Sequence, residues 1–345
     1  MKMNLRSVIA ISLSLVVGVG LIVLLLLASR VRWQDILSRS LAVDRMAFVR
    51  LCLLFALNSF LSSEKWRMTD RVVSQGGGKP LPRPTAFGLT AIGVALGQFL
   101  PIQISMSIAR TLGTLVYGRA LRRGTVATLF EQAFDFFVAI LMMLASVCAG
   151  LLQGGGVVWL AYALAGALLG VSCVGSLMKL ANRLAARLTV QATHAAGWRR
   201  SLAELQQSGL FHANLARPLT LISFARFAVL VLIASQVSSG VHIAIPLWRL
   251  GAAVPFGLMA GVVGITPGGL GLTEAAYATF FKLSGLSLAL STQWAIANRL
   301  LATAAIFIVG GGRGHDSGRQ QSLREVTHPQ GGKRCTGVER ASSAK

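Results

Sequence analysis

The residues best suited to chemistry lie in residues 264–274, which read Gly-Ile-Thr-Pro-Gly-Gly-Leu-Gly-Leu-Thr-Glu within a longer apolar run. In hydrocarbon, every backbone N–H and C=O needs an internal partner, so such a break survives only where protein buries it or where it lines a cavity. A carboxylate at membrane depth costs about 2.5–3.5 kcal/mol. We therefore expect this segment to bind a substrate. Its predicted site residues are Pro267, Gly268, Gly269, Gly271 and Glu274.

Four further ionisable residues, Arg110, Glu131, Asp135 and Arg299, lie within or beside apolar runs. A guanidinium binds a phosphate or carboxylate with paired donors, although either arginine could instead form an ion pair that only holds helices together. Glu131 and Asp135 are four residues apart and share a helix face. They could be counter-charges to Arg110 or a protonatable relay, or could face water near the inner end of a span.

We predict that Arg110, Glu131, Glu274 and Arg299 meet near the bilayer midplane, because each is too costly to retain unpaired in hydrocarbon. Glu274 and Arg299 are the expected partners, although Arg110 could compete for either acid. Glu274 has a second interpretation, in which it caps the helix that follows it. The two interpretations are compatible.

The composition is that of a membrane protein. Hydrophobic residues make up 54% of the chain and charged residues 13%, and the mean hydropathy is +0.66. Apolar runs of about 20 residues cross a bilayer core. They occupy residues 8–28, 126–152, 157–178, 219–237 and 288–309, with a shorter run at 47–61. We expect an all-α polytopic membrane protein with about six full spans.

The net charge of +22 does not indicate nucleic-acid binding, because the basic residues are spread among short loops and match no nucleic-acid motif. Lys and Arg in such loops set orientation. The basic segments 65–83 and 179–218 are therefore expected in the cytoplasm, as are both termini, and residues 153–156 outside. Residues 311–345 are expected to be a disordered basic tail that follows a membrane domain at 1–310. The scattered cysteines and histidines predict no metal site, and no cofactor is expected.

Two apolar segments, 84–119 and 247–286, begin and end on the same side in this topology, so we expect each to be a re-entrant hairpin. The first is broken at Pro101 and the second at Pro267. Arg110 and then Glu131 follow the first break, whereas Glu274 and then Arg299 follow the second. Broken helices with exchanged charges are typical of inverted repeats whose breaks meet near the midplane.

These motifs resemble the flippase-like membrane domain of the lysylphosphatidylglycerol synthase/flippase family. The resemblance covers roughly residues 5–310 and depends mainly on Thr-Pro-Gly-Gly-Leu-Gly-Leu-Thr-Glu-Ala-Ala at 266–276. Phe-Leu-Pro at 99–101, Leu-Phe-Glu-Gln-Ala-Phe-Asp at 129–135, Asn-Arg-Leu at 298–300 and Lys-Trp-Arg at 65–67 add to it. The chain departs from the family after Pro101, where a glycine is common and this sequence reads Ile-Gln-Ile-Ser-Met-Ser.

The resemblance implies a lipid substrate of the aminoacyl, glyco or isoprenoid type, handled in the inner membrane of a bacterium. We expect the protein to bind this lipid and move it between leaflets. The alternatives are a lipid-modifying transferase and an accessory subunit that binds a lipid-synthesis enzyme. The sequence offers no room for a large soluble catalytic domain, which argues against an enzyme, and no Walker motif for ATP-driven pumping.

Overall fold

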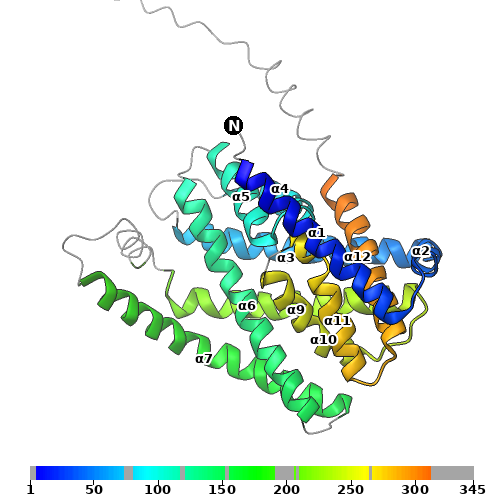
Figure 1. Cartoon of the computed structure of the whole chain (residues 1–345). Coiled ribbons are helices and arrows are strands. Elements are labelled where there is room, and N and C mark those ends of the chain that lie inside the picture. Colours follow the sequence, from blue (N-terminus) through cyan, green and yellow to red (C-terminus); the bar gives the residue numbers. More distant parts are fainter. Residues whose placement is uncertain are drawn as a thin grey trace, which may run out of the picture.

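The computed structural model describes residues 5–73, 81–116, 121–151, 155–190, 206, 210–263 and 266–311, and every regular element in these ranges is helical (Figure 1). In chain order the elements are α1 (Leu5–Ser29), α2 (Trp33–Leu41), α3 (Arg45–Val73), α4 (Arg83–Leu96), α5 (Ile102–Val116), α6 (Leu121–Leu151), α7 (Gly156–Val190), α9 (Ala213–Gly240), α10 (Leu247–Val263), the 3₁₀ turn η1 (Pro267–Gly269), α11 (Leu272–Leu283) and α12 (Leu288–Gly311).

Six of these helices, α1, α3, α6, α7, α9 and α12, are long and apolar enough to cross a membrane. This confirms the predicted class, an all-α polytopic membrane protein. The spans are not equally embedded. Only 11% of the residues in the apolar stretch of α1 and 17% of those in α7 are buried, against 39% in each of the other four. The interior is therefore built from α3, α6, α9 and α12, together with the shorter helices packed among them.

The two predicted breaks lie where the prolines placed them. α4 ends at Leu96 and α5 begins at Ile102, so Pro101 lies directly before α5. α10 ends at Val263 and α11 begins at Leu272, with Pro267 opening the turn η1 between them. In each broken segment the two short helices pack against each other.

The two breaks also contact each other. The backbone N–H of Gly268, in the second break, donates a hydrogen bond to the carbonyl oxygen of Leu100, in the first, at 3.2 Å. Broken helices that meet are what the inverted-repeat pattern predicts. That each segment returns to the membrane face from which it entered stays a prediction.

One assignment made from loop charge is wrong, because Lys65 and Arg67 do not lie in a loop but on α3, where both are buried. The basic segment 179–218 begins on a helix, since α7 continues to Val190. A helix of this length exceeds the roughly 20 residues that a bilayer core needs, so its last turns extend beyond the hydrocarbon. The predicted tail lies outside the described residues except for Gly311.

The loop-charge topology predicts how single cysteines label. In a background without the four native cysteines, Gly155→Cys should react with a membrane-impermeant maleimide in intact cells. Arg200→Cys should react only after the cells are opened, because the basic segment that contains it stays in the cytoplasm. The reverse pattern of labelling would contradict this orientation.

Candidate functional site

The break between α10 and α11 takes a backbone conformation that favours glycine. Gly268, Gly269 and Gly271 have φ angles of 57°, 71° and 79°, in the left-handed region that other residues enter only at a cost. Space is limited as well. A Cβ atom on Gly268 would lie 2.7 Å from the carbonyl oxygen of Gly97 and 3.1 Å from that of Gln98. The first break thus approaches the second so closely that only glycine fits between them.

Arg299, on α12, joins the second break to α11. Its Nη2 donates a hydrogen bond to the carbonyl oxygen of Gly268 at 2.7 Å, and its Nε lies 3.3 Å from Oε1 of Glu274. The other carboxylate oxygen of Glu274 accepts the backbone N–H of Gly271, the N-cap residue of α11, at 2.6 Å. The predicted pairing of Glu274 with Arg299 is confirmed, and Glu274 also caps the helix.

A second ionic group surrounds Glu131 on α6. Its Oε1 lies 2.5 Å from Nη1 of Arg110, and its Oε2 lies 3.4 Å from Nζ of Lys65 on α3. The side chains of all three residues are at most 1% exposed. The interpretation of Glu131 as a water-facing residue near the end of its span is therefore wrong.

Arg110 has partners on every side of its guanidinium. Besides Glu131, it donates hydrogen bonds to Thr90 on α4 and to Ser62 on α3. Its guanidinium carbon also lies 5.0 Å from the centre of the Trp66 ring. These contacts tie α5 to α3, α4 and α6, so Arg110 holds the first broken pair in place.

Asp135, one helical turn after Glu131, lies at the edge of the same group, and its side chain is 30% exposed. It accepts a hydrogen bond from Lys65 at 2.5 Å and another from the hydroxyl of Ser223 at 2.8 Å. It also forms an ion pair with Arg226 on α9. Nε of Arg226 in turn donates to Oδ1 of Asn58 on α3 at 3.2 Å. Lys65, Arg110, Glu131, Asp135 and Arg226 are hereafter called the charged cluster.

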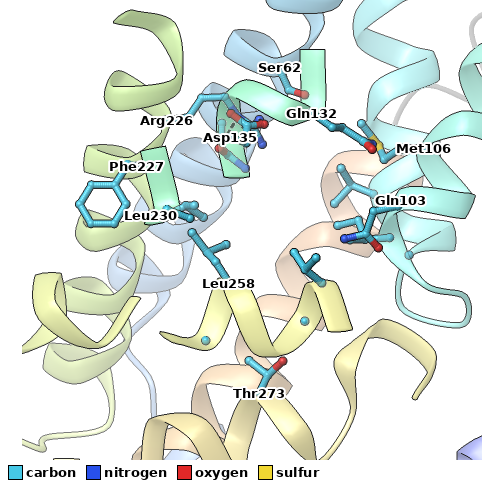
Figure 2. A pocket seen from close by; sticks show the side chains of 18 of the residues that line it. Ser62, Gln103, Met106, Gln132, Asp135, Arg226, Phe227, Leu230, Leu258 and Thr273 are labelled. Atoms are coloured by element: carbon cyan, nitrogen blue, oxygen red, sulfur yellow. Dashed lines mark hydrogen bonds and ion pairs between the residues drawn. The ribbon is translucent and has the colours of Figure 1, made fainter. Parts of the chain in front are cut away.

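A cavity of about 290 Å³ lies between the charged cluster and the second break. Its walls differ in character (Figure 2). Arg226 and Asp135 lie close together on one side, Gln103 and Gln132 extend from another, and Phe227, Leu230 and Leu258 supply an apolar side. The volume is near the lower end for small-molecule sites. The cavity therefore presents ionic, amide and apolar groups to a single occupant.

The predicted site residues divide into two sets. Those that line the cavity are Glu131, Asp135, Gly268 and Arg299. Those that lie behind its wall or in the adjoining turn are Arg110, Pro267, Gly269, Gly271 and Glu274. The four-charge constellation is also divided, since Arg110–Glu131 and Glu274–Arg299 are two separate ion pairs.

Sequence reasoning missed the contributions of Lys65 and Arg226. Lys65 was counted as a loop charge, and Arg226 lies in the run 219–237, which was treated as a plain span. The sequence did contain a signal for Arg226, which is surrounded by apolar residues. An ionisable residue at membrane depth is costly, so its presence usually indicates a functional site. Its partner Asp135 could not be named from spacing, since the two residues are 91 positions apart.

Comparison with protein families gives the class. Residues 9–310 match the family model described as the lysylphosphatidylglycerol synthase TM region. The chain therefore belongs to this family of integral membrane proteins, as the sequence motifs suggested. A search of curated proteins found no match.

The close approach at Gly268 predicts that even one methyl group is harmful there. Gly268→Ala should lower the free energy of unfolding by about 1–3 kcal/mol, because the left-handed backbone is strained and the Cβ meets two carbonyl oxygens. Gly261→Ala is the matched control. Its Cβ would meet only Oγ1 of Thr273, at 3.6 Å, and alanine favours the helix. Thermal unfolding in detergent gives the midpoint temperature of each variant. Equal midpoints would contradict the close approach of the two breaks at Gly268.

The buried charges predict a non-additive pair. Glu131→Gln leaves Arg110 and Lys65 with only Asp135 as counter-charge, which should cost about 3–5 kcal/mol of stability. Adding Arg110→Met should restore part of that loss, because the stranded cation is removed. Asp35→Asn, which neutralises an exposed acid, serves as the control. Thermal unfolding in detergent is measured for the wild type, Glu131→Gln, the double variant and Asp35→Asn. A double variant less stable than Glu131→Gln would show that the loss does not come from a stranded cation.

Proposed function

We propose that this protein binds an amphipathic lipid in the cavity and moves it between the two leaflets. The observation that carries the proposal is the cavity itself, which combines ionic and apolar walls inside a membrane domain. A lipid needs this combination, because its head group must be sheltered from hydrocarbon while its chains stay in an apolar environment. Membership in a lipid-handling family supports the same conclusion.

The helix breaks suggest how a head group could pass the midplane. Both breaks meet next to the cavity, and Gly268 and Gln98 contribute to its wall. If the two broken pairs enter from opposite faces, as loop charge predicts, each separates the cavity from one side of the membrane. Movement of one pair against the rest would then expose the cavity to one leaflet at a time, as in transporters built from inverted repeats.

A transferase activity is less well supported by the groups that line the cavity. Glu131 and Asp135, its two carboxylates, are both engaged by cations. A general base has to be free to accept a proton from the reacting group. Service as an accessory subunit of a lipid-synthesis complex remains the second alternative, and it predicts no transport by the purified protein.

The proposal predicts that filling the cavity stops transport. Leu258 lies on α10 and extends into the cavity (Figure 2), so Leu258→Trp should occupy the space of a head group and abolish movement. The assay reconstitutes the protein in vesicles with fluorescent lipid analogues and measures the fraction that becomes accessible to an impermeant quencher.

The matched control is Leu221→Trp, which makes the same substitution on the outward-facing, 55% exposed side of α9. It should retain wild-type transport, because its side chain faces the surrounding lipid. Equal transport by both variants would contradict a route through the cavity. If the wild-type protein, reconstituted without any partner, moves no lipid, the accessory role is favoured.

A further inference from the structure

The charges around the cavity do not balance. The charged cluster contains three cations, Lys65, Arg110 and Arg226, against two carboxylates, Glu131 and Asp135. With all five ionised, its net charge is +1. Arg299 and Glu274, on the second break, cancel each other. The groups around the cavity thus carry one excess positive charge in an environment where an uncompensated charge is costly.

Two guanidinium groups present the positive charge to the cavity. Arg226 and Arg299 both line it, and their side chains are 17% and 19% exposed. Nε and Nη1 of Arg226 bind Asn58 and Asp135, and within the described ranges no protein acceptor is bonded to Nη2. Nη2 of Arg299 binds the Gly268 carbonyl, its Nε faces Glu274, and its Nη1 is similarly without a described acceptor. Each arginine therefore keeps donor capacity for a ligand.

From this charge balance and these donors, we propose that the cavity selects a lipid whose head group is a singly charged phosphodiester. The inference rests on the proposed function and names the substrate class of the same cavity. A phosphodiester supplies the one missing negative charge, and its oxygens accept hydrogen bonds from guanidinium donors. The apolar side formed by Phe227, Leu230 and Leu258 accommodates the first carbons of the chains.

Other head groups do not neutralise the excess charge of +1. A zwitterionic phosphodiester, such as phosphatidylcholine, leaves the net charge at +1. Lysyl-phosphatidylglycerol carries a net charge of about +1, because its lysyl group adds two ammonium groups to the one phosphate charge, and it raises the imbalance to +2. A phosphate monoester with two charges, or a diphosphate, reverses the sign of the imbalance. Singly anionic lipids, whether glycerophospholipids or isoprenoid phosphodiesters, are the class that neutralises the cavity.

The test compares head groups in one membrane. The full-length protein is reconstituted in phosphatidylcholine vesicles with fluorescent phosphatidylglycerol, phosphatidylcholine or lysyl-phosphatidylglycerol. We expect phosphatidylglycerol to move about tenfold faster than either of the others, because it alone neutralises the excess charge, and an uncompensated buried charge costs at least the free energy of a factor of ten. If all three move at equal rates, the proposed function survives but the charge selection is overturned. If none moves, the proposed function itself fails.

Variants of Arg226 test whether its positive charge or the shape of its side chain causes the preference for phosphatidylglycerol. Arg226→Gln brings the net charge of the cluster to zero and should abolish the preference for phosphatidylglycerol, whereas Arg226→Lys should retain it. Lys282→Gln, which removes an exposed charge on α11, should leave the preference unchanged. A preference that persists in Arg226→Gln would overturn the assignment to this residue.

A binding measurement keeps the proposal testable if Arg226→Gln does not fold. Native mass spectrometry of the wild-type protein should show phosphatidylglycerol retained in preference to both other lipids. Inorganic phosphate and glycerol 3-phosphate are added as soluble competitors. Neither should displace the lipid, because neither has chains to occupy the apolar side. Displacement by inorganic phosphate at the concentration of the lipid would make this a site for free anions and overturn the lipid assignment.

Discussion

The structure depends on the contact between two interrupted helical segments. A break in a helix leaves backbone N–H and C=O groups without partners, which hydrocarbon does not tolerate. Here part of that need is met by the bond from Gly268 N–H to Leu100 C=O, which joins the two breaks, and by the bond from Arg299 on α12 to Gly268 C=O. The break is thereby buried in protein next to a cavity, one of the two settings in which irregular backbone survives in a membrane.

The charged cluster determines how the surrounding helices pack against one another. Glu131 and Asp135 lie on one face of α6, and their cationic partners come from α3, α5 and α9. Because a stranded charge would be costly in hydrocarbon, these four helices can be arranged in few ways. The cluster resembles a structural core on its Arg110 side, where all groups are buried, and a binding surface on its Arg226 side, which opens to the cavity.

Much of this could be predicted from local sequence, and the remainder could not for a physical reason. Apolar run length indicated the spans, and Pro101 and Pro267 located both breaks, because these are properties of adjacent residues. The pairing of Glu274 with Arg299 could be predicted because an unpaired charge is costly in hydrocarbon and few oppositely charged partners were available. The partners of Asp135 depend on how α3 and α9 pack, which no local pattern encodes, and Lys65 was misplaced because charge alone does not distinguish a loop from a buried helix face.

The cavity between the breaks and the charged cluster is the proposed place of a lipid head group. A cryo-EM structure of the protein in nanodiscs that contain phosphatidylglycerol would locate that head group. We expect phosphate density inside the cavity, within hydrogen-bond distance of Arg226 or Arg299, with acyl density along Phe227 and Leu230. Phosphate density confined to the outer surface of the helices, with water or side chains filling the cavity, would contradict it.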